Sequence, residues 1–171
     1  MELLDALSTR RSYRKFKQDS MVDEDSITDV LKAAMTGPSA GNTRPWEFIV
    51  IRDRNILSRI GEMRPYMKEM LEQVPVMIIV VFNEEREKYP NRWIQDCSVV
   101  TQNILLAVHA KGFAGSWQEI YPEEKTMKGM HEILSLPDNV IPFAMVPIGE
   151  PDEEKDDRKT FEEEIIHFDE W

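Results

Sequence analysis

A run of seven apolar residues, from Val76 to Phe82, constrains the fold of this chain more than any other feature. The run has the length of a strand, is rich in β-branched residues and has no polar residue at alternate positions. A strand that is apolar on both sides needs cover on both faces of its sheet. We therefore expect this run to be a central strand with helices on each side.

The remaining sequence supplies helices and a few further strands. Apolar residues at helical spacing predict helices, and β-branched runs bounded by turn residues predict strands. The expected helices cover 2–9, 23–37, 53–60, about 65–71, 93–111 and 122–134, and the other expected strands cover 48–51, 141–148 and a short stretch after 112. Few strands, separated by helices without regular βαβ spacing, predict an α+β fold with a small central mixed or antiparallel sheet flanked by helices.

Pro142 and Pro147 fall within the last predicted strand. Proline cannot donate a hydrogen bond to the ladder and is usually confined to sheet edges or strand ends. We therefore expect residues 141–148 to form an edge strand, or a strand shortened at its ends.

Length and charge narrow the possible functions. The 171 residues predict one domain spanning 1–171, and the formal net charge of -11 disfavours binding to nucleic acid. No apolar run reaches the roughly 18 residues that cross a bilayer, so no membrane partner is expected. The N-terminal residues lack a secretory pattern, which makes the cytoplasm the expected location.

Cysteine and histidine give no sign of a metal site. Cys97 is the single cysteine, and it lies on the apolar face of the predicted helix 93–111, where a buried hydrophobic role is expected. His109, His131 and His167 are far apart, and none forms a pair at metal-ligand spacing. We predict no metal, and we assign His109 a structural role on the long helix.

Familiar catalytic and nucleotide-binding motifs are also absent from the sequence. It contains no glycine-rich dinucleotide fingerprint, no P-loop and no nucleophile elbow. The carboxylates are numerous, and no pair stands out as an acid and a base.

Residues 10–17 carry five cations and no acid in a chain that is otherwise acidic. One interpretation is a solvated positive patch that balances the acidic C-terminal segment. The other is an anion site, because in an extended segment Arg10, Ser12 and Arg14 share one face while Tyr13 points away. Two guanidinium groups and a hydroxyl suit a phosphate.

Two loops could form the rest of such a site. The loop from Pro38 to Trp46 is small, polar and bounded by prolines; it is either a plain connection with an aromatic anchor or a flat surface for a ring, to which Ser39 and Asn42 would supply hydrogen bonds. The residues of 114–120 include small side chains that allow close approach of the backbone. Trp117, in that stretch, is either a core aromatic residue or part of the same site.

Residues 150–171 are mostly acidic but carry an apolar patch made of Phe161, Ile165, Ile166, Phe168 and Trp171. The segment is too polar for a core element and too apolar for a free tail. We interpret it as an arm that docks on another surface, such as a second subunit.

Four stretches together resemble the FMN-dependent nitroreductase family. Arg10-Arg11-Ser12-Tyr13-Arg14 resembles its N-terminal Arg-x-Ser-x-basic motif. The loop from Pro38 to Trp46 resembles its Pro-Ser-x-x-Asn-x-Gln-Pro-Trp loop, with Arg44 in place of Gln. The stretch 112–117 resembles its Gly-Leu-Gly-x-x-Trp turn, and Gly149-Glu150-Pro151, followed by Arg158-Lys159, resembles its closing motif. Order and spacing match across nearly the whole chain.

The resemblance implies an intertwined α+β homodimer with FMN at the subunit interface and with residues 150–171 packed on the partner. Arg10, Ser12 and Arg158 would hold the phosphate and ribityl end, and Arg14 would lie near the pyrimidine edge of the ring. There it would stabilise the negative charge that develops on reduced flavin. The loop 38–42 would come from the partner subunit, and the backbone of 117–119 would face N5 and O4. The implied cofactor-binding residues are Arg10, Arg11, Ser12, Arg14, Pro38, Ser39, Ala40, Asn42, Trp117, Gln118, Glu119 and Arg158.

The resemblance also implies a reaction in two halves. NADH or NADPH gives hydride to FMN, and a small acceptor such as a nitroaromatic compound or a quinone then takes the electrons. Because the cofactor carries the chemistry, no catalytic side chain is required. Two alternatives stay open: a flavin-binding protein without efficient turnover, which serves storage, sensing or partner binding, and a polyanion binder that uses residues 10–17.

The sequence departs from the family pattern at several places. The chain is short, residues 83–92 form a compact charged loop, and Glu119 and Ile120 stand where many members have Gly. Tyr66 and Glu69 are the candidates for a ring contact from the region 60–75. We expect Lys15 and Lys17 neither to bind the phosphate nor to lie beside the ring.

Overall fold

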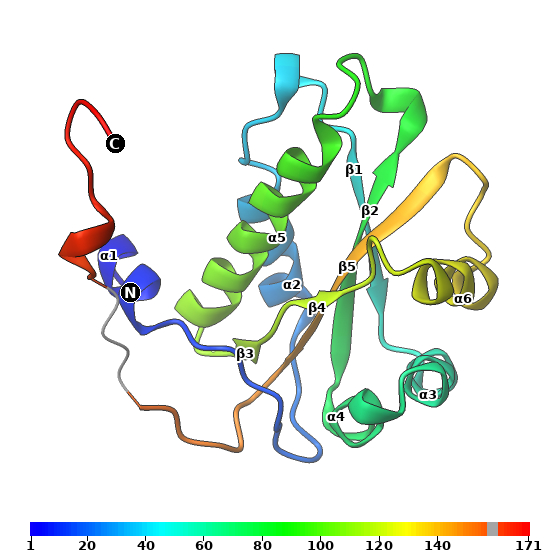
Figure 1. The fold of residues 1–171 in the computed structure, drawn as a ribbon. Coiled ribbons are helices and arrows are strands. Elements are labelled where there is room, and N and C mark those ends of the chain that lie inside the picture. The colour runs from blue at the N-terminus through cyan, green and yellow to red at the C-terminus, as the bar shows by residue number, and fades with distance from the viewer. Residues whose placement is uncertain (157–160) are drawn as a thin grey trace.

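The computed structural model describes residues 1–156 and 161–171 (Figure 1). Its helices are α1 (Leu3–Thr9), α2 (Glu24–Ala34), α3 (Arg54–Met63), α4 (Lys68–Gln73), α5 (Trp93–Ala110) and α6 (Glu124–Leu134). Its strands are β1 (Trp46–Ile51), β2 (Val76–Asn83), β3 (Ala114–Gly115), β4 (Gln118–Glu119) and β5 (Val140–Gly149). Short 3-10 turns are η1 (Ala40–Asn42), η2 (Pro65–Met67), η3 (Glu84–Arg86) and η4 (Glu163–Ile165).

The strands form one antiparallel sheet in the order β1-β2-β5-β3, and β4 pairs with β5 beside β3. In β2, Ile79 lies opposite Ile49 of β1 and Met145 of β5. The apolar run 76–82 is therefore an interior strand, as the sequence predicts, and the α+β class is confirmed.

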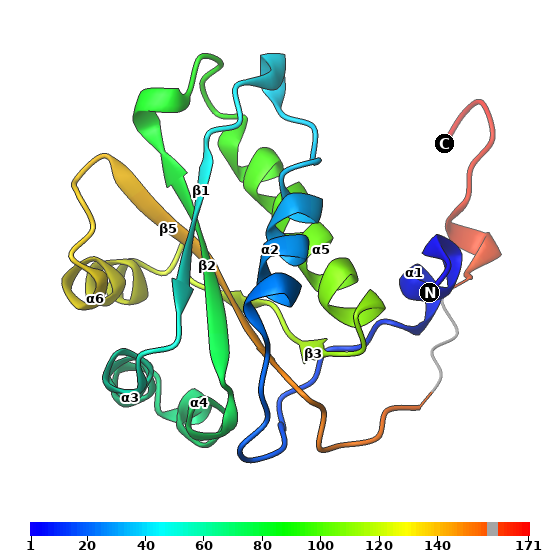
Figure 2. The same cartoon turned by 180° about the vertical axis from the view of Figure 1, so that it is seen from behind.

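Successive side chains of β2 enter two separate cores. Val76, Ile78, Val80 and Phe82 pack in a first core with α2 and α5. The alternate residues, among them Ile79, pack in a second core with α3, α4 and α6. Figures 1 and 2 show these two groups of helices on opposite faces of the sheet. Since burying one large apolar side chain is worth roughly 1.5–3 kcal/mol, the unbroken apolar run stabilises both layers.

Aspartate caps begin two of the helices at the positions that the sequence indicates. The Asp23 carboxylate accepts a hydrogen bond from Ser26 N–H at 2.7 Å at the start of α2. Asp53 accepts from Asn55 N–H at 2.7 Å and from Ile56 N–H at 3.2 Å at the start of α3. These carboxylates satisfy N–H groups that have no partner within the helix.

The prediction for residues 141–148 was wrong. β5 is an interior strand that runs from Val140 to Gly149, with β2 on one side and β3 and β4 on the other. Pro142 pairs with Val81 next to a register shift between Val80 and Val81. The Pro147 carbonyl oxygen lies close to Gly115. Because the amide nitrogen and the carbonyl of one residue face the same side of a strand, the Pro147 nitrogen, which carries no hydrogen, also faces that side, between the two short pairings of β3 and β4. A bulge at Phe143 of β5, which has no partner in β2, and the gap between β3 and β4 thus accommodate both prolines.

α5 is the longest helix, with 18 residues, and it spans about 27 Å. Its first turn lies near η1, and its last turn lies near α1 (Figure 2). Among the described residues, no helix is both long enough and apolar enough to cross a membrane.

The C-terminal segment 161–171 lies beside α1 and away from the sheet (Figures 1 and 2). Every one of its residues is exposed, including Phe168 at 83% and Trp171 at 101%. Its expected contact with a partner subunit stays a prediction, and Arg158 lies outside the described residues.

Candidate functional site

The basic segment 10–17 runs as an extended strip between β3 and the chain that follows β5. On one side, Tyr13 N–H donates to the Gly115 carbonyl at 3.1 Å, and Ser12 forms a parallel bridge with Gly115. On the other side, Lys17 N–H donates to Glu150 O at 3.0 Å. Backbone hydrogen bonds to both segments therefore hold the strip.

Phe16 anchors this strip to the protein. Its ring is fully buried in the second core, and its N–H donates to the Gln73 side chain at 3.1 Å. The buried Phe16 ring thus fixes the position of the cationic segment relative to the second core.

Glu153 is a second anchor. Its carboxylate accepts the backbone N–H of Arg14 at 2.7 Å and that of Lys15 at 3.3 Å, and Lys155 donates to it. Burial alone would raise the pKa of Glu153, but these hydrogen bonds outweigh burial and hold the pKa below its ordinary value. The ionised carboxylate therefore orients the backbone from which the Arg14 side chain projects.

The arginines of the strip lie in different settings. Arg11 donates to the carbonyls of Ser8 at 2.9 Å and Arg10 at 2.8 Å, and its Nε donates to Asp156 O at 3.1 Å. Arg10 and Ser12 are half-buried, whereas Arg14 is exposed. Arg11 thus joins the end of α1 to the chain that follows β5.

Arg14 lines a small pocket that opens between the strip, η2, α4 and β4. The pocket has a volume of about 130 Å³, and its lining consists of Arg14, Lys15, Tyr66, Met67, Glu69, Met70 and Gln118. The structure thus brings together two predicted site residues, Arg14 and Gln118, with both candidates from the region 60–75. Lys15 also lines it, and the expectation that Lys15 neither binds the phosphate nor lies beside the ring stays a prediction. The two methionines carry no recognisable sequence signal.

Arg64 links the elements that surround this pocket, and nothing in the sequence singles it out. Its Nη1 donates to the Glu119 carbonyl at 2.9 Å and to Thr126 Oγ1 at 3.0 Å, and it pairs with Glu123 at 3.1 Å. Its guanidinium also lies 5.0 Å from the centre of the Tyr66 ring. The half-buried Arg64 guanidinium therefore holds β4, α6 and the Tyr66 ring in place relative to one another.

The stretch 117–119 divides between core and site. Trp117 meets Phe143 edge-on with ring centres 5.8 Å apart and packs against the first core. Gln118 is buried and donates to Ser116 Oγ at 2.9 Å. Glu119 is exposed, while its carbonyl accepts from Arg64. The aromatic anchor thus holds the backbone of this stretch against the sheet.

The loop that contains Pro38 and Ser39 lies at the far end of α5. Ala40 N–H donates to both carboxylate oxygens of Asp96, at 3.1 and 3.3 Å. Burial raises the pKa of Asp96, and the bond from Ala40 only partly offsets this effect. Asp96 therefore fastens the loop to the first turn of α5.

Polar side chains within this loop bond to Arg44. Ser39 Oγ accepts from Arg44 N–H at 2.9 Å, and the Asn42 side-chain oxygen accepts from Arg44 Nε at 3.0 Å. Gly41 has a left-handed φ of 56°, and a Cβ there would collide with the Tyr89 ring. The compact segment 83–92 thus packs over the loop through Tyr89.

One chain does not bring the loop and the basic strip together. Asp96 holds the loop, and His109, which is thirteen positions further along α5, contacts the residue before Arg10. Thirteen helical positions correspond to about 20 Å. The predicted site residues therefore form two separate groups in the described chain.

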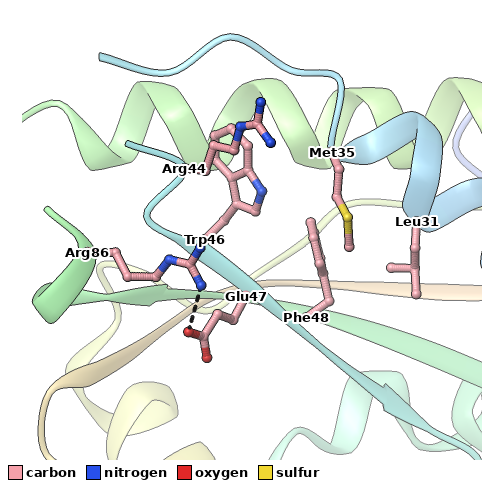
Figure 3. Close-up of a pocket in the computed structure, with 7 residues that line it drawn as sticks. All are labelled: Leu31, Met35, Arg44, Trp46, Glu47, Phe48 and Arg86. Atoms are coloured by element: carbon pink, nitrogen blue, oxygen red, sulfur yellow. Dashed lines mark hydrogen bonds and ion pairs between the residues drawn. The ribbon is translucent and has the colours of Figure 1, made fainter. Parts of the chain in front are cut away.

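A larger cavity of about 470 Å³ lies on the outer side of β1 (Figure 3). Its lining is Leu31, Met35, Arg44, Trp46, Glu47, Phe48 and Arg86. Arg86 pairs with Glu47 at 3.4 Å across its rim. None of the predicted cofactor-binding residues lines it, and it adjoins the unpaired edge of the sheet. Elsewhere among the described residues, no group of three or more His, Cys, Asp and Glu side chains is arranged to hold a metal ion.

The chain is similar to known proteins in both sequence and structure. The model of the nitroreductase family matches residues 7–64 and 62–150. A protein of Methanothermobacter thermautotrophicus named "Putative NADH dehydrogenase/NAD(P)H nitroreductase" is 45% identical over 171 residues, which is 100% of this chain and 88% of that protein. The solved structure of an FMN-dependent nitroreductase from Clostridium difficile R20291 has a TM-score of 0.88 at 28% identity and covers 98% of this chain and 99% of that chain. An iodotyrosine deiodinase from Haliscomenobacter hydrossis is 27% identical over 84% of this chain and 77% of that protein. With a family match over most of its length and a full-length relative at this identity, the chain belongs to the nitroreductase family.

Proposed function

We propose that this protein is an FMN-dependent NAD(P)H oxidoreductase that passes hydride through flavin N5 to a nitroaromatic compound, a quinone or a similar acceptor. The observation that carries the proposal is the pocket that joins Arg14 with Gln118, on a strip whose other two arginines, Arg10 and Arg11, lie toward α1. When bound, FMN would accept and release the hydride.

The residues of the pocket suit a flavin. Arg14 offers a cation, Gln118 an amide, and Met67 and Met70 an apolar surface against which a flat ring can lie. The pocket, at about 130 Å³, is smaller than the roughly 300–1,000 Å³ of typical small-molecule sites. A single chain therefore offers part of a site, which supports a second subunit as the source of the remaining wall.

The chain's own residues would divide the work between the two ends of the cofactor. Arg10 and Ser12, joined by Arg158 from outside the described residues, would hold the phosphate and ribityl end. Arg14 would stabilise the negative charge of the reduced ring, and Glu153 would orient Arg14 through its backbone. Arg11 would act indirectly, because its guanidinium is bonded to three carbonyls.

A homodimer would complete the site. The loop 38–42 lies about 20 Å from the basic strip in one chain, so a partner's loop could reach the strip if two α5 helices packed in opposite directions. The exposed apolar residues of 161–171 and the open edge beside the cavity of Figure 3 support an arm that reaches across to the partner. A cytoplasmic location stays a prediction.

The absorbance spectrum of the purified protein, followed by anaerobic titration with NADH and with NADPH, tests the proposal. We expect a flavin spectrum, with or without added FMN, that bleaches on addition of one or both nicotinamides and returns on addition of a quinone or a nitroaromatic compound. A protein that stays colourless after incubation with FMN would refute the proposal.

A flavin-binding protein without efficient turnover is the second candidate. Glu119 is exposed beside Gln118, and an acid there would oppose the charge of reduced flavin. Bound flavin that neither nicotinamide bleaches would favour this candidate. Binding of polyanions that collapses with salt, in a protein that takes up no flavin, would instead favour the polyanion interpretation of residues 10–17.

A further inference from the structure

His109 connects the last turn of α5 to the phosphate end of the proposed flavin site. Its Nε2 lies 2.7 Å from Thr9 Oγ1, and Thr9 is the last residue of α1, directly before Arg10. The Thr9 hydroxyl donates its proton to the Asp5 carbonyl at 2.6 Å. Because a hydroxyl has one proton, His109 Nε2–H is the donor in the bond to Thr9. The histidine therefore holds the turn from which the arginines project.

Opposing influences act on the charge of this ring. Burial lowers the pKa of His109, and the guanidinium groups of Arg10 and Arg11 lower it further. The end of a helix, by contrast, favours a cation. The next cation along the chain, Lys111, is paired with Asp29 of α2 at 2.8 Å. Among the described residues, Arg10 and Arg11 are the charged groups that shift the ring's titration, so an anion on these arginines would favour the protonated ring.

We propose that His109 is a positioning residue of the phosphate subsite, which orients the Arg10 turn through Thr9 and takes up one solvent proton as a phosphate monoester binds. This inference rests on the proposed function. It assigns the residue a role in cofactor affinity beyond the structural role expected from its place on a long helix.

The expected pH dependence follows from the direction of the shift. At pH 8 the ring of the flavin-free protein is neutral, because its pKa lies below the ordinary value of 6.5. A bound phosphate raises that pKa, so the affinity gained from proton uptake grows as the pH falls from 8 toward 6. The second ionisation of the phosphate, with a pKa of about 6, affects every variant equally. It therefore cancels when the FMN affinity of a variant is divided by that of the wild type.

The test measures the dissociation constants of FMN and of riboflavin by flavin fluorescence, using the full-length chain freed of flavin. His109→Gln keeps an N–H donor for Thr9 but cannot take up the proton, and His109→Ala removes both. His131→Gln, on α6 across the sheet, is the matched control. Riboflavin lacks the phosphate and so separates the phosphate subsite from the ring subsite.

We expect His109→Gln to bind FMN like the wild type at pH 8 and about three- to tenfold more weakly at pH 6, which corresponds to roughly 0.7–1.4 kcal/mol. His109→Ala should weaken FMN binding at both pH values, while riboflavin binding and the control should not change. Calorimetry in two buffers of different ionisation enthalpy should show less proton uptake for His109→Gln. The inference would be overturned if the ratio of the FMN affinities of the wild type and His109→Gln did not change with pH. An equal loss of riboflavin affinity would overturn it too. Failure of the wild type to bind any flavin would instead overturn the proposed function, and this inference with it.

Discussion

Asp96 illustrates how a single buried acid can join two distant parts of the sequence. Its side chain is 7% exposed and accepts the N–H of Ala40, so the loop 38–42 keeps its position at the start of α5. Burial nevertheless makes the charged form costly and raises the pKa of the carboxyl group.

The raised pKa of Asp96 predicts a pH-dependent stability. An acid whose pKa is higher in the folded than in the unfolded state stabilises the fold at low pH, and this contribution is lost as the pH rises above its ordinary value of 3.8. Asp96→Asn keeps an acceptor for Ala40 but does not titrate. We therefore expect the stability of the wild type, measured by urea unfolding, to fall relative to Asp96→Asn between pH 4 and pH 7. If the free energies of unfolding of the wild type and Asp96→Asn differed by a constant amount across this range, the result would contradict a raised pKa for Asp96.

Only part of the site's residues could be predicted from the sequence. The basic strip belongs to a recognisable motif and Gln118 directly follows another, and the structure brings Arg14 and Gln118 to one pocket. Arg64 and Glu153 act through partners 55 to 139 positions away in sequence. Long-range contacts of this kind depend on packing, and no local pattern encodes them. Arg11 is among the residues expected to bind the cofactor, but its side-chain hydrogen bonds go to backbone carbonyls, and its role toward FMN stays a prediction.

At the level of elements, local chemistry predicted most helices and strands, since caps, periodicity and apolar runs are short-range signals. The prediction for β5 was wrong because proline was judged by its own strand alone. The pairing with its neighbours decides the outcome: a bulge at Phe143, which has no partner in β2, and the gap between β3 and β4 accommodate the two rings.

Arg54 supports the end of α4 in a way that can be tested. Its guanidinium donates to the carbonyls of Leu71, Glu72 and Val74 at 2.6–2.8 Å, where the helix leaves acceptors without partners. We expect Arg54→Ala to lower the free energy of unfolding by about 2 kcal/mol, because three charge-assisted bonds are lost. Arg59→Ala, which removes one bond of 3.4 Å, should cost at most about 0.5 kcal/mol. Equal urea midpoints for the two variants would show that Arg54 does not support the helix end.

For the whole molecule, the central question is how two groups of site residues at opposite ends of α5 could meet. The proposed homodimer answers it, and the exposed aromatic residues of 161–171 offer its most direct test. These side chains are exposed, and the one ring contact found for them among the described residues, Trp171 stacked on His167 at 4.4 Å between ring centres, lies within the same segment.

We expect the wild type to sediment as a dimer at micromolar concentration. Phe168→Ala combined with Trp171→Ala should raise the dimer dissociation constant at least about tenfold, because the apolar surface buried by the arm is lost. Glu163→Gln combined with Glu164→Gln, a control in the same arm, should change it little. A wild type that sediments as a monomer with flavin bound would refute the proposed dimer.

The position of the basic strip between β3 and the segment after β5 has a consequence for biosynthesis. Residues 10–17 leave the ribosome early, but their backbone partners are Gly115, Glu150 and the N–H of Asp152. A nascent chain that ends before these residues has no completed strip and no anchored Arg14. Capture of the proposed flavin would therefore be one of the last events of folding, since the cationic N-terminal strip stays without its final partners until these late residues have been made.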